Sequence, residues 1–197
     1  IVEDANRLNL RAAGQTGNLV AEYAAYGWSV DANENFQTRV DFHYSNAGSP
    51  GWVGMAVENS NNNYVSIMAG ADGNTPYFWY EQVVDGNTTS SAETSRASND
   101  GTLYISYNAA SDELYLSYTG YGAANAWQTV TSLLQGQWLS KPLGIAIGGG
   151  SNGGSIDNNQ VYLDNLEVTA GKALGWPPAS DLNKDGLIDG LDVKVMS

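Results

Sequence analysis

Turn-forming residues interrupt residues 1–170 roughly every 8–12 positions, which restricts most of the elements between them to short strands. Clusters of Gly, Asn, Asp and Ser separate runs that are rich in Val, Ile, Tyr and Trp. Helical periodicity is almost absent, with one short candidate around 129–135, and no βαβ pattern occurs. We therefore expect an all-β protein of about ten strands, folded as an antiparallel two-sheet β-sandwich.

Alternation of apolar and polar residues is clearest at 36–44. The apolar members of this run fall on one face and are predicted to point inward: Phe36, Val40, Phe42 and Tyr44. The polar members fall on the other face: Gln37, Arg39, Asp41 and His43. Because side chains alternate across a strand, the second set is predicted to face solvent.

Residues 103–118 predict a hairpin around the turn at 108–112. Its apolar positions are predicted to pair across the two strands: Leu103, Ile105 and Tyr107 with Leu114, Leu116 and Tyr118. Further strands are expected at 53–57, from 65 onward, and at 77–84, 143–147 and 161–168. Gly171, Gly175 and the Pro177-Pro178 pair then break regular structure, so we expect a β-sandwich domain at 1–170 and a Gly/Pro linker at 171–180.

The hairpin Gly101–Ser117 and the closing pattern Leu143–Val168 resemble the concanavalin A-like lectin/glucanase superfamily. The likeness extends loosely over residues 5–170. It implies a jelly-roll of two curved sheets, and the superfamily includes lectins, carbohydrate-binding modules, glycosidases and polysaccharide lyases. Fold likeness alone does not assign one of these functions.

The polar face of residues 36–44 supplies the first candidate ligand site, made of Arg39, Asp41 and His43. Trp52, Glu58, Tyr64 and Ser66 are expected on the same side of neighbouring strands. Aromatic rings stack on sugar C–H faces, while charged groups hold sugar hydroxyls. The alternative is the ordinary solvated face of an antiparallel sheet.

The chain has six tryptophans, more than a core of this size needs. Most are expected to be buried or half-buried. Trp127 lies in a loop-like stretch beside Tyr121, Gly122 and Asn125, so it is a candidate ring for sugar contact.

Catalytic motifs are weak in this sequence. The Glu-x-Asp-x-Glu string of retaining glycosidases in this superfamily does not occur, although four carboxylates are left open as an active-site set: Asp41, Glu58, Glu81 and Glu113. A triad or lyase site would need the single histidine, His43, and no Gly-x-Ser-x-Gly elbow is present. The sequence therefore favours a binding protein over an enzyme.

The formal net charge of −13 argues against nucleic acid and anionic lipid partners, because like charges repel. No apolar run reaches the length of a membrane span, so no membrane insertion is expected. Cysteine is absent, which excludes disulfides and thiolate metal sites. The chain starts at Ile1, and the composition is typical of extracellular β-proteins that bind sugars, so we expect a secreted or cell-surface protein.

Residues 181–192 have the spacing of a calcium loop. Oxygen ligands are expected from five side chains and one backbone carbonyl: Asp181, Asn183, Asp185, Asp189, Asp192 and the carbonyl of Leu187. Gly186 permits the sharp reversal of such a loop. An acidic turn without metal is the alternative.

This loop ends in Asp192 rather than Glu, and Gly175-Trp176-Pro177-Pro178 stands before it in place of a helix. Together these features resemble the first half of a type I dockerin, over residues 181–197. The resemblance implies Ca²⁺ as cofactor, and a cohesin partner if the full-length protein carries the complete dockerin. The second loop-helix segment does not follow before Ser197, so we expect a longer parent protein.

Asp164 shares the phase of Tyr162, Leu166 and Val168 and is predicted to point inward. A buried carboxylate needs a cation or several hydrogen bonds. In related carbohydrate-binding modules an Asp-Asn pair near the last strand contributes to a structural calcium, with Glu3 or Asp4 as candidate partners here. The alternative is a β-bulge that turns Asp164 outward.

These observations favour a non-catalytic, lectin-like module that binds a polysaccharide or glycan and belongs to a larger polysaccharide-active or surface protein. The alternatives are a glycoside hydrolase or polysaccharide lyase without a recognisable motif, or a purely structural or adhesion module.

Overall fold

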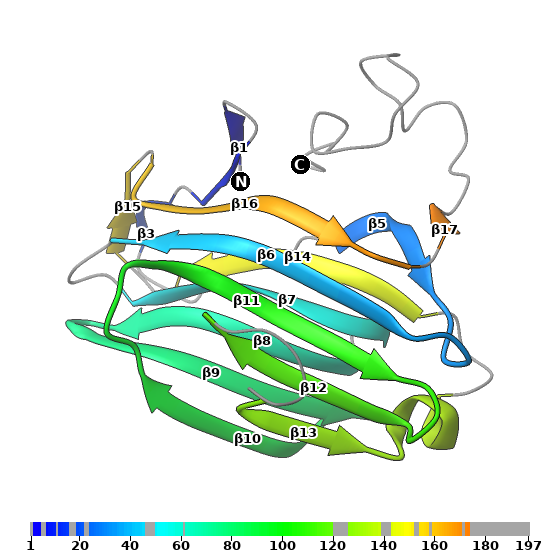
Figure 1. Ribbon diagram of the computed structural model, residues 1–197. Coiled ribbons are helices and arrows are strands. Elements are labelled where there is room, and N and C mark those ends of the chain that lie inside the picture. The colour runs from blue at the N-terminus through cyan, green and yellow to red at the C-terminus, as the bar shows by residue number, and fades with distance from the viewer. Residues whose placement is uncertain are drawn as a thin grey trace.

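The computed structural model shows two antiparallel β-sheets packed face to face (Figure 1). It describes these ranges: 2–4, 7–10, 12–15, 19–21, 24–45, 50–60, 62–119, 126–138, 143–151, 154–157, 159–170 and 172–173. The predicted fold class, an all-β two-sheet sandwich, is confirmed.

Seven strands form one sheet, in this order: β1 (Val2–Asp4), β2 (Arg7–Asn9), β16 (Val161–Val168), β6 (Phe36–Tyr44), β11 (Asp100–Asn108), β12 (Glu113–Tyr118) and β13 (Gln128–Thr131). The eight-stranded sheet has the order β10 (Asn87–Ser95), β9 (Thr75–Val84), β8 (Asn63–Asp72), β7 (Gly51–Ser60), β14 (Leu143–Ser151), β5 (Ala24–Val30) and β17 (Lys172–Ala173), with β4 (Leu19–Ala21) also on β14. Two further strands pair with each other, β3 (Ala12–Gln15) and β15 (Gly154–Ile156).

Strand β6 covers the range in which the sequence alternates, and its buried and half-buried residues alternate along its whole length. The predicted hairpin is confirmed as β11 and β12, with Leu103 opposite Tyr118, Ile105 opposite Leu116, and Tyr107 opposite Leu114. A π-helical turn at Leu133–Gln137 replaces the short helix expected near 129–135. Lys172–Ala173, at the start of the predicted linker, forms β17 and pairs with β5.

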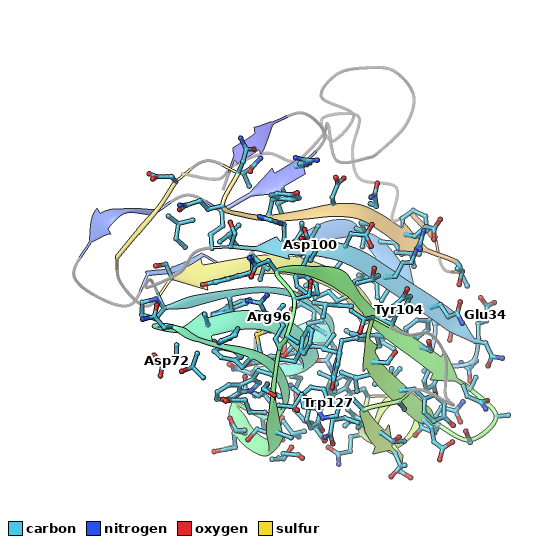
Figure 2. The ribbon with its side chains drawn as sticks, turned by 60° about the vertical axis from the view of Figure 1, so that its left-hand side comes forward. Glu34, Asp72, Arg96, Asp100, Tyr104 and Trp127 are labelled. Carbon is cyan, nitrogen blue, oxygen red and sulfur yellow. The ribbon has the colours of Figure 1, made fainter. Side chains whose placement is uncertain are left out.

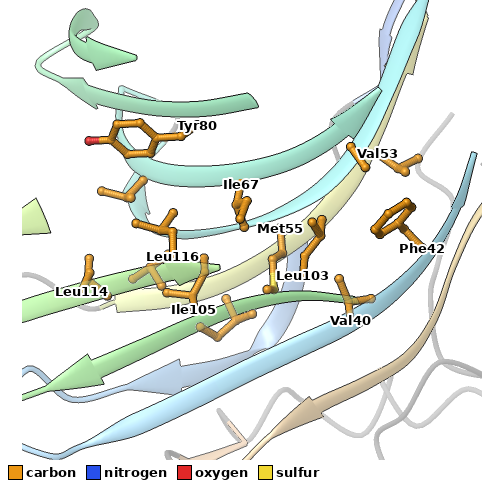
Figure 3. Close-up of a cluster of buried hydrophobic side chains, with 14 of the residues drawn as sticks. Val40, Phe42, Val53, Met55, Ile67, Tyr80, Leu103, Ile105, Leu114 and Leu116 are labelled. Atoms are coloured by element: carbon orange, nitrogen blue, oxygen red, sulfur yellow. The ribbon is translucent and has the colours of Figure 1, made fainter. Parts of the chain in front are cut away.

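Between the sheets lies a continuous apolar core, part of which is drawn in Figure 3. Met55 and Ile67 enter it from the eight-stranded sheet, and Val40, Leu103 and Ile105 from the seven-stranded sheet. Each of these five side chains is at most 2% exposed. Burial of this apolar surface is the main force that holds the two sheets together.

The strands of the eight-stranded sheet curve away from this core toward their ends, so the outer face of the sheet is concave (Figure 3). We call it the concave face, and the outer face of the seven-stranded sheet the convex face. Gly54, Ser66 and Gly70 belong to the concave face, yet all three are buried. On a concave surface larger neighbours converge over small residues, which accounts for this burial.

Candidate functional site

The first predicted group lies on the convex face. Arg39 borders a shallow hollow of about 380 Å³ whose other lining residues are Gln37, Thr38, Tyr104, Glu167 and Thr169. The Arg39 Nε donates to Glu167 Oε2 over 2.6 Å, and this hydrogen bond, followed by the charge of Glu167, raises the pKa of the guanidinium. Arg39 is therefore already engaged by a carboxylate of its own protein.

Asp41 and His43 are also engaged by neighbouring side chains. Thr102 donates to Asp41 Oδ1 over 2.6 Å, and the Asn165 amide donates to Asp41 Oδ2 over 2.9 Å. His43 Nδ1 lies 2.6 Å from Asp100 Oδ1, and the imidazole stacks on Tyr162 with centroids 4.8 Å apart. This network ties β6 to β11 and β16, and it matches the alternative reading of an ordinary solvated sheet face.

The second predicted group lies on the other sheet. Trp52, Glu58 and Tyr64 stand on β7 and β8, whereas Arg39 and its neighbours stand on β6. The expectation that the two groups share one surface is wrong, because the chain passes from one sheet to the other between β6 and β7. The predicted ligand residues therefore divide between two faces on opposite sides of the core.

Aromatic rings lie over glycines on the concave face. A Cβ placed on Gly150 would come within 2.9 Å of the Trp52 Nε1, and one on Gly70 within 2.8 Å of the Tyr77 Cζ. Trp79 packs edge-on to Tyr77, with centroids 6.2 Å apart and planes at 63°. Glycine at these positions leaves space for the rings to lie close to the sheet. We call the surface formed by Trp52, Tyr77 and Trp79 the aromatic floor.

Polar groups border this floor. Tyr64 donates to Glu81 Oε2 over 2.8 Å, and Thr88 donates to Glu81 Oε1 over 2.9 Å. Glu58 lies directly opposite Tyr64 in the register of β7 and β8, so it stands on the same face. Carboxylates accept hydrogen bonds from sugar hydroxyls, and aromatic rings stack on sugar C–H faces, so the two kinds of group side by side suit a sugar ligand.

Two buried polar atoms on the concave face have no hydrogen-bond partner in the part of the chain that the structure describes. They are the Trp79 Nε1 and the Ser66 Oγ. Ser66 is 6% exposed and faces Glu81 in the strand register. Because buried polar groups are nearly always hydrogen-bonded, these two atoms mark a place where a water or a ligand would complete the bonding.

Trp127, the predicted loop ring, is half-buried just before β13. It packs edge-on against Tyr118, with centroids 5.5 Å apart, and Tyr118 stacks on Phe78 at 3.9 Å. The neighbours that suggested a sugar-facing loop lie outside the described residues: Tyr121, Gly122 and Asn125. The described contacts of Trp127 are with the core.

Asp164 does not point inward as predicted. Val161 and Leu163 are the buried residues here, whereas Asp164 is half-buried and its Oδ2 accepts a hydrogen bond from Arg7 Nε over 3.2 Å. The register of β16 on β6 shifts between Asp164 and Glu167, and Asn165 has a φ of 52°, so the β-bulge alternative is correct.

The calcium hypotheses are not decided by the described ranges. In these ranges no group of three or more His, Asp or Glu side chains could hold a metal ion. The side chains of Glu3 and Asp4 and the whole of 181–197 lie outside them, including every loop ligand: Asp181, Asn183, Asp185, Leu187, Asp189 and Asp192. A calcium role for these residues and for Asp164 stays a prediction.

The four carboxylates left open as an active-site set do not come together. Asp41 and Glu113 belong to the convex face, and Glu58 and Glu81 to the concave face. Sequence reasoning missed Trp79 and Tyr77 as candidate ligand residues. Tyr77, Trp79 and Glu81 share one phase of residues 77–84, and this alternation was the available signal.

Tyr77 gives the concave face a pH dependence. The pKa of its phenol is raised to about 12, first by burial and then by the charges of Glu93 and Asp72, while Arg96 opposes them. Since the folded state favours the neutral phenol, this stabilisation is complete below about pH 10 and is lost as the pH rises toward about 12. Denaturant unfolding should therefore show a smaller loss of stability over this range in Tyr77→Phe than in the wild type, and equal losses would contradict this assignment.

Comparison with known proteins supports the fold. No family model and no curated protein matches the sequence. A functionally unknown protein from Saccharomyces cerevisiae matches with a TM-score of 0.51 and 12% identity, over 86% of this chain and 90% of that chain. The legume lectin-like domain from Entamoeba histolytica matches with a TM-score of 0.50 and 14% identity, over 85% of each chain.

A Bacteroides ovatus protein described as xyloglucan PUL GH43B also matches, with a TM-score of 0.50 and 10% identity, over 71% of this chain and 27% of that chain. At these identities the likeness concerns the fold alone. It confirms the jelly-roll β-sandwich expected from the sequence. In the described residues no helix is long and apolar enough to cross a membrane.

Proposed function

We propose that this chain is a non-catalytic, lectin-like carbohydrate-binding module that holds a glycan on its concave face. The observation that carries the proposal is the aromatic floor of Trp52, Tyr77 and Trp79, together with the unsatisfied Trp79 Nε1 and Ser66 Oγ. The rings would stack on sugar C–H faces, and the two polar atoms would bond sugar hydroxyls. Glu58 and Glu81 would orient the ligand.

The convex hollow is a weaker candidate site. Its arginine is paired with Glu167, and the neighbouring Asp41 and His43 have partners within the protein. A ligand there would have to displace these contacts before it gained its own. We therefore place the glycan on the opposite sheet, and Arg39 serves below as the matched control.

The module would belong to a larger extracellular polysaccharide-active or cell-surface protein. The calcium loop expected at 181–192 would form part of a dockerin-like tail, and cohesin would be a partner only through a complete dockerin. Each of these roles is part of the proposal and follows from the sequence resemblance.

A glycoside hydrolase is the second candidate, because Glu58 and Glu81 share the concave face. Both oxygens of Glu81 accept hydrogen bonds from neighbours, which suits a fixed acceptor more than a group that delivers a proton.

Affinity electrophoresis against soluble xyloglucan, mixed-linkage β-glucan and laminarin tests the proposal. We expect retarded migration with at least one of these neutral polymers and no release of reducing sugar on long incubation. Reducing-sugar release that is lost in Glu81→Gln would favour the hydrolase. Unretarded migration in every gel would contradict a carbohydrate-binding role on this panel.

A further inference from the structure

Two carboxylates flank Trp79, one on each of two sides. In the register of β9 and β10 it faces Glu93, and Glu81 follows two positions along on the same face of β9. Glu93 is exposed and Glu81 is half-buried, so both carboxylates lie where a ligand stacked on the indole would meet them.

The charged residues in the strands around Trp79 are all acidic. Strands β7, β8, β9, β10 and β14 contain four acidic residues and no lysine or arginine: Glu58, Asp72, Glu81 and Glu93. Lys172, the one basic residue in the strands of this sheet, belongs to β17 at the edge opposite β10. Arg96, which follows β10, is 5% exposed and donates to the backbone carbonyls of Tyr44, Gly70 and Ser98. Glu93 is opposite Trp79, and Asp72 is two residues along β8 from Gly70, which is opposite Tyr77. The charges of both carboxylates raise the pKa of Tyr77.

The unsatisfied atoms lie in the same area. The Ser66 Oγ is on the residue opposite Glu81, and the Trp79 Nε1 belongs to the indole between the two carboxylates. A hydroxyl both donates and accepts, and an indole N–H only donates. The two atoms therefore call for a ligand that carries an acceptor oxygen beside the group that the carboxylates bind.

We propose that Trp79, Glu81 and Glu93 form a subsite for the protonated amine of an amino sugar, so that the preferred glycan contains hexosamine units with free amino groups. The inference rests on the proposed function, since it names the sugar class held by the same face. An ammonium group gains a cation–π contact with the indole and charge-assisted hydrogen bonds to the carboxylates. A neutral sugar gains only stacking and neutral hydrogen bonds, and a uronate is repelled.

The test compares ligands that differ at the amine. Isothermal titration of the full chain at about pH 5.5 would use the hexamer of glucosamine, the hexamer of N-acetylglucosamine and an oligogalacturonate, at about 20 and about 500 mM NaCl. We expect the amine form to bind roughly tenfold more tightly than the acetylated form at low salt. High salt should reduce this ratio severalfold, and the uronate should not bind.

Glu93→Gln is the decisive variant, because its side chain is exposed and the substitution keeps its shape. It should lower the ratio of the affinity for the glucosamine hexamer to that for the N-acetylglucosamine hexamer by about threefold or more. Glu113→Gln is the matched control: it removes the same charge from the convex face, where the carboxylate accepts from Ser111, and the ratio should not change.

Three outcomes would overturn the inference. If both hexamers bind equally to the wild type, the proposed function stands and the amine subsite fails. If Glu113→Gln lowers the ratio as much as Glu93→Gln, the amine is attracted by the net charge of −13 and not by this subsite. If neither hexamer nor any neutral polymer of the panel binds, the proposed function fails as well.

Discussion

Replacing Trp79 with alanine is expected to weaken glycan binding by about 30-fold or more, the loss typical of a central aromatic contact. Trp79 is half-buried on the concave face, packs against Tyr77 and carries an unsatisfied indole nitrogen. The variant removes both the stacking surface and the donor. The dissociation constant for the tightest-binding polymer of the panel measures the loss.

Two companion variants separate binding from folding. Trp79→Phe keeps a ring and loses the N–H, so it should bind with intermediate affinity. Arg39→Ala removes the cation of the convex hollow and should bind like the wild type. If Arg39→Ala loses affinity and Trp79→Ala does not, the glycan binds on the convex face and the proposed site is wrong.

Replacing Arg96 with methionine is expected to cost about 3–5 kcal/mol of folding stability. Arg96, labelled in Figure 2, follows β10. Its guanidinium donates to the backbone carbonyls of Tyr44 on β6, Gly70 on β8 and Ser98, so it links the two sheets. Burial lowers the pKa of this guanidinium, which lies over the rings of Tyr44 and Phe42. Methionine would fill much of the volume and leave the carbonyls without their donor.

The thermal midpoint should fall by roughly 6–20 °C, given about 2–4 °C per kcal/mol for a chain of this size. Arg39→Met serves as the control, because its ion pair with Glu167 is exposed and the midpoint should hardly change. A midpoint for Arg96→Met equal to that of the wild type would show that this arginine does not link the sheets.

The fold could be predicted from the sequence where a strand has one solvent-exposed face and one buried face. β6 and the β11–β12 hairpin were found because their apolar residues alternate and Gly, Asn and Asp mark their ends. β10 was missed because it is a polar edge strand, and nearly all its residues are exposed. Its Ser/Thr sequence therefore has no apolar alternation to signal a strand.

The site was predicted only in part, because alternation tells which residues face away from the core but not which sheet a strand joins. Arg39 and Trp52 both point outward, yet β6 and β7 pair in different sheets. That choice is set by long-range packing, which a local pattern does not contain. Asp164 was misplaced for a related reason: a β-bulge at Asn165 shifts the phase within one strand.

The most direct test of the central claim is to locate the bound glycan. A ¹H–¹⁵N spectrum of the wild type would be recorded during titration with the tightest-binding polymer fragment, with the Trp79 indole signal identified from Trp79→Phe. We expect the largest shifts at this indole and at the amides of β7, β8 and β9. Shifts confined to β6, β11 and β16, around Arg39 and Tyr104, would contradict the account.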